Sequence, residues 1–128
     1  DVNVLVAWGW DDHPDHDRAT RWIIATRSRE PDMLFTSAIP QMGFVRVSVQ
    51  RSPATVIPES AGRILKKMLA WLGGSHRFAE DDQESFDWPA WCTGASRTTD
   101  AHLLALAKAH GAELATLDAG IPGAYLIP

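Results

Sequence analysis

Two kinds of apolar pattern alternate along this chain of 128 residues. One is a long segment with helical spacing, and the other is a short continuous run. Recurrence at every third or fourth position predicts helices, and short apolar runs bounded by glycine, proline or polar residues predict buried strands. The predicted helices cover about residues 1–8, 15–29, 39–49, 58–72 and 98–110, and the predicted strands cover 33–36, 76–79, 113–117 and 125–127. This alternation predicts an α/β fold, namely a three-layer α/β/α sandwich around a mainly parallel central sheet.

One stretch near the carboxyl end combines a helix, a glycine stop and a strand. Thr98 and Thr99 stand where a helix needs a cap, so we expect their hydroxyl oxygens to accept first-turn N–H groups. Gly111 can take the left-handed conformation that ends a helix. Asp100 then lies in the first turn of the helix, and Asp118 lies at the carboxyl end of the following strand. Ligands bind at that edge in open α/β sheets, so both acids are candidate site residues.

The composition indicates one ordinary globular domain, because hydrophobic residues make up 45% and charged residues 22% of the chain. No apolar run approaches the ~20 residues that a membrane-spanning helix needs, and nothing resembles a signal peptide. Cys92 is the only cysteine, which excludes a disulfide framework and a cysteine metal site. We therefore expect no membrane association and a reducing, cytoplasmic environment.

The net charge of −4 argues against a protein that merely coats nucleic acid. The charge is unevenly distributed, since residues 1–70 hold nine Lys/Arg and eight Asp/Glu, whereas residues 71–128 hold three and eight. One predicted helix and its exit carry four arginines: Arg18, Arg21, Arg27 and Arg29. A basic face beside an acidic pocket is compatible with a phosphate backbone held near a metal ion. A solvated helix face is the more common reason for any single one of these arginines.

Three acids, Asp1, Asp100 and Asp118, lie at the edges of predicted elements rather than on a polar surface stripe. If the elements at Asp1 and Asp118 are neighbours in a parallel sheet, the three carboxylates converge, and they cannot all stay ionised without a cation. Oxygen ligands with room for water select Mg²⁺ or Mn²⁺, which can orient a water and stabilise charge on a phosphoryl oxygen. The pattern indicates phosphodiester hydrolysis. Each acid also has an ordinary explanation, since first-turn acids, turn aspartates and acids at a chain end are common.

Four blocks of the sequence stand in an order found in a known family: Asp1-Val2-Asn3-Val4-Leu5, residues 36–47 (TSAIPQMGFVRV), residues 99–107 (TDAHLLALA) and residues 115–118 (ATLD). They resemble the conserved blocks of PIN-domain ribonucleases, and most of all those of the VapC toxins of bacterial toxin–antitoxin systems. The resemblance implies a single PIN domain over residues 1–128 and RNA cleavage that depends on Mg²⁺ or Mn²⁺. It also implies growth arrest, neutralisation by a cognate VapB-type antitoxin, and a homodimer.

The resemblance assigns roles to individual residues. It implies that three acids hold the metal ion and act in catalysis: Asp1, Asp100 and Asp118. Asn3 corresponds to the amide of the family's Asp-x-Asn motif, and Thr116 to the hydroxyl residue that often precedes the last acid by two positions. Arg46, in the second block, is a candidate contact to RNA phosphate, with an ordinary ion pair as the alternative.

The chain departs from the family pattern at two places. Gln41 stands where the family usually has a glutamate, so this catalytic position offers a carbonyl oxygen but no charge and no base. We expect a weaker or differently hydrated metal site as a result. The family also has a strand before its first acid, whereas nothing precedes Asp1 here, so we expect the sequence to begin late. An α-ammonium group at Asp1 would otherwise compete with the cation.

Two other functions remain open at this stage. A PIN fold with a degraded metal site could bind RNA or an antitoxin without cutting, and Gln41 favours this alternative. Asp1-Val2-Asn3 also faintly resembles the DxD start of haloacid dehalogenase-type phosphatases, but Asn3 stands where that motif needs an acid, and no matching lysine block is present.

The remaining candidate residues have more ordinary interpretations. His13 and His16 could form a metal pair, but loop and helix-cap roles are the more common ones for such a motif. The six tryptophans exceed what a small core needs. We expect three of them in the core, Trp8, Trp22 and Trp71, and three on a partner surface, Trp10, Trp88 and Trp91.

Overall fold

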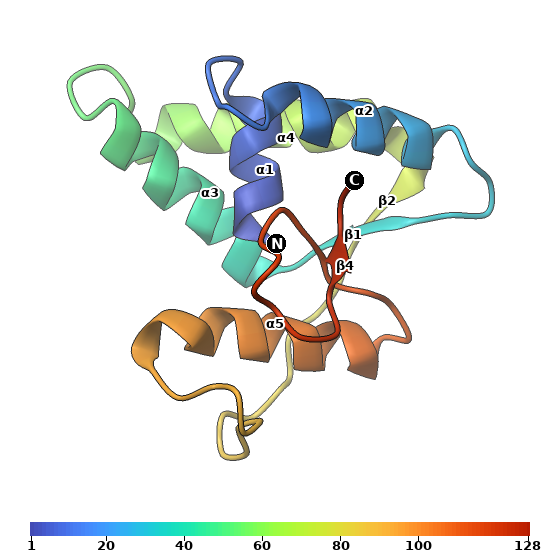
Figure 1. The fold of residues 1–128 in the computed structure, drawn as a ribbon. Helices are drawn as coiled ribbons and strands as arrows, with labels where there is room; N and C mark the ends of the chain where they lie inside the picture. Colours follow the sequence, from blue (N-terminus) through green and yellow to red (C-terminus); the bar gives the residue numbers. More distant parts are fainter.

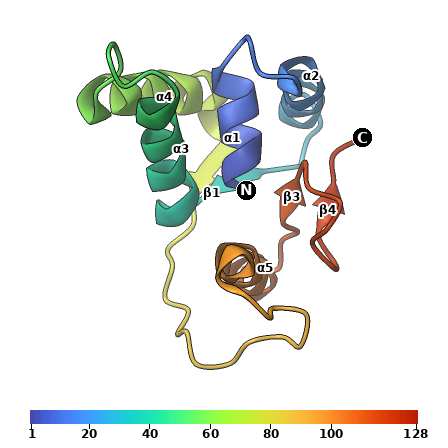
Figure 2. The same cartoon turned by 60° about the vertical axis from the view of Figure 1, so that its left-hand side comes forward.

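Helices form the two outer layers of the molecule, and short parallel strands lie between them (Figure 1). The computed structural model describes all residues, 1–128. In chain order the elements are α1 (Val2–Gly9), α2 (His16–Arg27), β1 (Leu34–Thr36), α3 (Ala38–Arg51), α4 (Pro58–Leu72), the 3₁₀ turn η1 (Gly73–Ser75), β2 (His76–Phe78), the 3₁₀ turn η2 (Ala95–Arg97), α5 (Thr98–Ala109), β3 (Ala115–Thr116) and β4 (Tyr125–Leu126). Helices α1 to α4 lie on one side of the strands and α5 on the other (Figure 2), which confirms the expected three-layer α/β/α fold.

The four strands form two parallel pairs, β1 with β2 and β3 with β4. Helices α3 and α4 connect β1 to β2, which is the kind of crossover that parallel pairing requires. A largely apolar cleft of about 660 Å³ is lined by β1 and β3 together with α1 and α5. The parallel character of the strands is confirmed. They are shorter than the sequence patterns predicted, because only two or three residues of each strand pair with a neighbour.

The expected stop of α5 is observed, whereas its expected cap is not. Asp1 is the N-cap of α1, and its Oδ1 accepts from the first backbone N–H of the helix at 2.6 Å. Gly111 follows α5 with φ +65°, which confirms the predicted stop. The expected threonine cap of α5 is wrong. The N-cap is Arg97 without a side-chain bond, and Thr98 Oγ1 donates to Ala95 O (2.9 Å) because the preceding 3₁₀ turn brings that carbonyl within reach.

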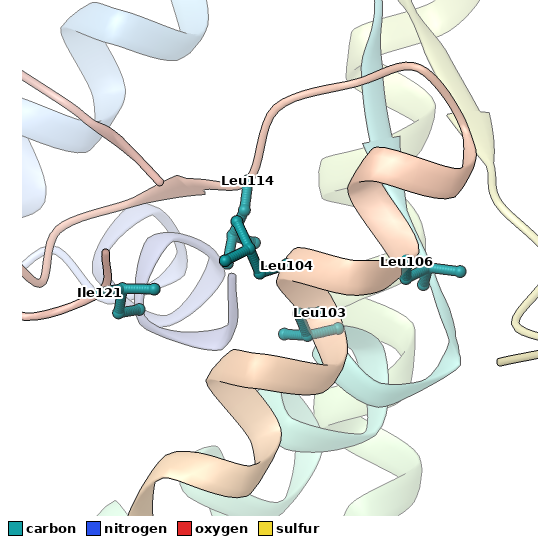
Figure 3. Packing of buried hydrophobic residues seen from close by; sticks show 5 residues of the cluster. All are labelled: Leu103, Leu104, Leu106, Leu114 and Ile121. Carbon is teal, nitrogen blue, oxygen red and sulfur yellow. The ribbon is translucent and has the colours of Figure 1, made fainter. Parts of the chain in front are cut away.

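The core consists of three clusters of buried side chains, one of them under β3. In this cluster α5 contributes three leucines that pack against the segments on either side of β3 (Figure 3): Leu103, Leu104 and Leu106 against Leu114 and Ile121. The other two clusters join α1 to its neighbours: Leu5, Val6, Phe44 and Leu65 in one, and Val4, Ile23, Leu72 and Ile127 in the other. Helix α1 therefore packs against α2, α3 and α4 and against Ile127 near the carboxyl end of the chain. None of the helices combines the length and apolar character needed to cross a membrane.

The tryptophans divide differently from the expectation. Trp8 and Trp22 pack against the core, as predicted. Trp71 is 45% exposed, so its assignment to the core is wrong. Its ring instead lies under the guanidinium of Arg27, 4.0 Å from the ring centroid, and stays at the surface. Trp10 is half-buried, and its Nε1 donates to a serine hydroxyl of α3, which leaves less of it free for a partner.

Two glycines inside helices offer a matched test of this packing. A methyl group added at Gly43 would lie 2.6 Å from Val2 Cγ2, where α3 meets α1, whereas one added at Gly62 in α4 would meet no atom within 4 Å. Alanine stabilises a helix interior over glycine, so we expect Gly62→Ala to raise the free energy of unfolding by roughly 0.5–1 kcal/mol. Gly43→Ala should lower it by about 1–3 kcal/mol, the usual cost of overpacking. Urea denaturation checks both values, and a stabilised Gly43→Ala protein would contradict tight α1–α3 packing.

Candidate functional site

The hydroxyl group of Thr116 joins the start of the chain to strand β3. Thr116 is fully buried, with 0% exposure. Its Oγ1 donates to Asp1 Oδ2 at 2.7 Å and accepts from Asn3 Nδ2 at 3.0 Å and from the backbone N–H of Asp118 at 3.1 Å. One donor and two acceptor positions are all that a hydroxyl offers, so this group is saturated. A single buried oxygen therefore orients both Asp1 and Asn3.

Hydrogen bonds to backbone groups complete the arrangement around Asp118. Asn3 Oδ1 accepts from the Leu117 N–H at 3.3 Å. Asp118 Oδ1 accepts from the Gly120 N–H at 2.7 Å, and Arg97 Nη1 donates to the Gly120 carbonyl at 2.6 Å. The structure thus unites four of the residues that the sequence singled out: Asp1, Asn3, Thr116 and Asp118.

Asp100 lies in the first turn of α5, beside this group. Burial raises the pKa of the Asp100 carboxyl above its usual value, the nearby Asp118 carboxylate raises it further, and the Arg97 guanidinium acts in the opposite direction. The ionised form of Asp100 is therefore unfavourable here unless additional positive charge is present.

The α-amino group of Asp1 also lies within this region, where its nitrogen donates to Ala115 O at 3.1 Å. Burial lowers the pKa of this amino group to about 5, and the Asp100 carboxylate partly opposes that effect. Burial therefore disfavours the charged form of this group.

Gln41 lies in the first turn of α3 and is bonded to β1. Its Nε2 donates to Thr36 Oγ1 at 2.9 Å, and that hydroxyl is bonded to His76 Nε2 at 2.8 Å. Burial lowers the pKa of His76, which favours the neutral ring. Gln41 does not line the cleft that holds Asp1 and Asp100. Its amide links α3 to β1 and, through the Thr36 hydroxyl, to His76 of β2.

Asp1 and Asp100 line a common cleft of about 360 Å³ formed by α1, α3, the start of α5 and the loop after α1. Four further polar residues line it: Asn3, His13, Arg46 and Thr99. The sequence analysis named Arg46 as a candidate but assigned His13 to a loop role and overlooked Arg97. The place of Arg97 directly before the helix that carries Asp100 could have revealed it. No local signal places His13 at this cleft.

The donor set fits a hard divalent cation. No three His, Cys, Asp or Glu side chains lie close enough together to hold one ion by themselves. Mg²⁺ commonly takes only one or two protein carboxylates and keeps several waters. Asp1 and Asp100 provide two carboxylates in one cleft, and the raised pKa of Asp100 indicates negative charge that a cation would compensate. These two residues could hold such an ion, with Asp118 beside them.

Comparisons with known proteins agree with this arrangement. Residues 1–125 match the family model for the PIN domain. The chain is 39% identical over 124 residues to Ribonuclease VapC38 of Mycobacterium tuberculosis, covering 94% of this chain and 84% of that protein. It is 35% identical over 125 residues to Ribonuclease VapC39 of the same organism, covering 94% and 88%. For Ribonuclease VapC44 the values are 36% over 126 residues, covering 94% and 85%. The expected resemblance is confirmed, and the chain belongs to the PIN-domain family.

Proposed function

We propose that this protein is a metal-dependent endoribonuclease toxin of the VapC type, which hydrolyses phosphodiester bonds of RNA. The observation that carries the proposal is the cleft that Asp1 and Asp100 line together, with Asp118 close enough to raise the pKa of Asp100. Acids gathered at element edges suit phosphoryl chemistry. Relatives at 39% and 35% identity are named ribonucleases, which supports the same reaction for this chain.

The metal would be Mg²⁺ or Mn²⁺, which, when bound, lowers the pKa of a coordinated water and stabilises negative charge on a phosphoryl oxygen. Asp1 and Asp100 would hold the ion from α1 and α5, and Asp118 would be the third acid at the same edge. The Asp1 carboxylate is oriented by Thr116 and by the first N–H of α1, so the fold orders it before any ligand binds. Asn3 supports Asp1 through the same hydroxyl.

The substrate would be single-stranded or looped RNA, because the scissile strand must reach a recessed cleft. Arg46 on α3 would bind phosphate, since it lines the cleft and forms none of the ion pairs within the chain. Gln41 would contribute through its carbonyl oxygen Oε1, because its amide nitrogen is engaged by Thr36.

The proposal includes partners of the same system. A VapB-type antitoxin would inhibit the ribonuclease, and both would act in the cytoplasm, where the RNA is. A homodimer with two-fold symmetry would place two clefts along one shared groove.

A non-catalytic PIN-fold module that binds RNA or an antitoxin is the second candidate. Gln41 favours it, because an uncharged amide stands at a position where the family usually has a glutamate. The bond from Gln41 Nε2 to Thr36 points the same way, because it engages the amide within the fold. A measured affinity of the protein for Mg²⁺ distinguishes the two candidates, because the ribonuclease needs a bound metal ion and the module has a degraded metal site.

Removing one acid tests the enzyme directly. We expect Asp100→Asn to lower Mg²⁺-dependent cleavage of a structured RNA pool by at least about 100-fold, since even hydrogen-bond partners of metal ligands are worth 10–100-fold. Asp17→Asn is the matched control, because Asp17 is also a first-turn acid but lies exposed on α2. Gel assays with Mg²⁺, Mn²⁺ and EDTA provide the measurement. A folded wild-type protein that cuts no RNA would support the binding module instead.

Thermal unfolding tests the metal site without activity. The pKa of Asp100 is higher in the folded protein than in the unfolded chain, because its ionised form is unfavourable in the fold. The protonated carboxyl therefore adds to the free energy of unfolding at low pH, and this contribution is lost as the pH rises through the pKa of the folded protein. At pH 7.5 in EDTA we therefore expect Asp100→Asn to melt a few degrees above the wild type. Mg²⁺ should raise the melting temperature of the wild type but not of Asp100→Asn. Equal Mg²⁺ shifts in both proteins would contradict a metal site at Asp100.

Restoring the glutamate tests the role of position 41. We expect Gln41→Glu to lower the Mg²⁺ concentration for half-maximal cleavage by about three- to tenfold, because it restores the negative charge that the family usually has at this position. Gln50→Glu, an exposed change on the same helix, should have no effect. If Gln41→Glu leaves the Mg²⁺ dependence unchanged, position 41 serves only the contact with Thr36.

A further inference from the structure

His13 occupies the loop between α1 and α2 and lines the same cleft as Asp1 and Asp100. Backbone hydrogen bonds hold this loop on both sides of the histidine. The His13 N–H donates to Trp10 O at 3.0 Å, and the His16 N–H donates to His13 O at 2.9 Å. The position of the ring beside the cleft is therefore a defined feature of the loop.

One hydrogen bond determines which ring nitrogen of His13 carries the proton. The backbone N–H of Asp15 donates to His13 Nδ1 at 3.0 Å. Nδ1 must be unprotonated to accept this bond, so the ring proton is on Nε2. Nε2 has no partner within the chain and is therefore an available donor.

The neighbouring histidine is arranged differently. His16 Nδ1 is bonded to the carbonyl of Ala7 at 2.9 Å, which ties the start of α2 to α1. A carbonyl can only accept, so His16 donates from Nδ1, whereas His13 accepts at Nδ1. The two rings thus have different roles, and the structure does not support them as a metal pair. His16 is structural, and His13 presents a donor.

Both acidic and basic side chains line the cleft. Asp1 and Asp100 provide two carboxylates, and Arg46 and His13 provide the two nitrogen donors. A phosphodiester over a metal ion has two non-bridging oxygens, and donors opposite the metal can stabilise the charge that the ion does not neutralise. Neither Arg46 nor His13 Nε2 is engaged elsewhere.

We propose that His13 is an RNA-binding residue whose Nε2–H donates to a non-bridging phosphate oxygen of a strand held in the cleft, beside Arg46. This inference rests on the proposed function, because it deepens the description of the same cleft. The Asp15 N–H sets the tautomer in the free protein, so no rearrangement precedes binding.

Two isosteric variants separate the donor from the loop contact. His13→Asn retains an acceptor at the position of Nδ1 and removes the outward donor, whereas His13→Gln places an amide nitrogen near the position of Nε2. Binding of a fluorescent single-stranded RNA pool is measured by anisotropy in EDTA, with all variants in the Asp100→Asn background so that no cleavage occurs. We expect His13→Asn to raise Kd about fivefold and His13→Gln to stay within about twofold. His110→Asn, at the far end of α5, is the control and should bind like the parent.

The salt dependence identifies the kind of contact. A neutral donor releases no counterion, so His13→Asn should weaken binding without changing the slope of log K against log salt. Arg46→Gln should make that slope shallower by about 0.7. The proposal is overturned if His13→Asn binds like the parent. It is also overturned if His13→Asn and His13→Gln lose affinity equally, since the loss would then not depend on a donor at the position of Nε2.

A measurement on the unmutated ring covers the case in which a variant unfolds. Long-range ¹H–¹⁵N spectra of ¹⁵N-histidine protein should show His13 in the Nε2–H tautomer and shift its Nε2 resonance when RNA is added, while His110 stays unchanged. A His13 ring protonated at Nδ1, or an Nε2 resonance that does not shift when RNA is added, would contradict the proposal. Neither the anisotropy measurement nor the spectra need RNA cleavage. A wild-type protein that cuts no RNA would therefore count against the proposed ribonuclease function, while the contact between His13 and phosphate would still be tested.

Discussion

A buried hydroxyl group with three hydrogen bonds connects the first residue of this chain to its last acid. Thr116 Oγ1 binds Asp1, Asn3 and the backbone of Asp118, and no water is needed to complete its bonding. Loss of this oxygen would leave polar groups of the half-buried Asp1 and Asn3 without these partners. The geometry of the acids and the packing of α1 against β3 therefore depend on the same contacts.

The ionised carboxylate of Asp100 is unfavourable in the folded protein. Burial and the carboxylate of Asp118 make the ionised form of Asp100 unfavourable, and Arg97 compensates only part of that cost. The rest of the molecule has to hold these charges together, and the three apolar clusters that surround α1 and α5 do so. A cation bound at this edge would remove the repulsion, so ligand binding and stability are linked through Asp100.

Local patterns in the sequence predicted the elements, and long-range contacts decided the rest. The apolar stripe and flanking proline and glycines predicted α4 over residues 58–72, as observed. The acids were located correctly at element edges, because caps and strand ends leave local signals. The Thr116 contacts could not be predicted, since 113 positions separate Asn3 from Thr116. The same limit explains Trp71, whose exposure depends on how the surface near Arg27 is arranged rather than on its own helix.

Position 41 shows how one uncharged residue can be consistent with its surroundings and still alter function. Gln41 donates to Thr36, which bonds to a neutral His76, so the chain of contacts carries no charge. A glutamate in that place would favour a protonated His76, because a carboxylate raises the pKa of a nearby imidazole. The amide therefore suits the half-buried histidine but adds nothing to the negative charge available for a cation. The negative charge in this region comes from the carboxylates, and the raised pKa of Asp100 reflects its burial together with the neighbouring Asp118 carboxylate.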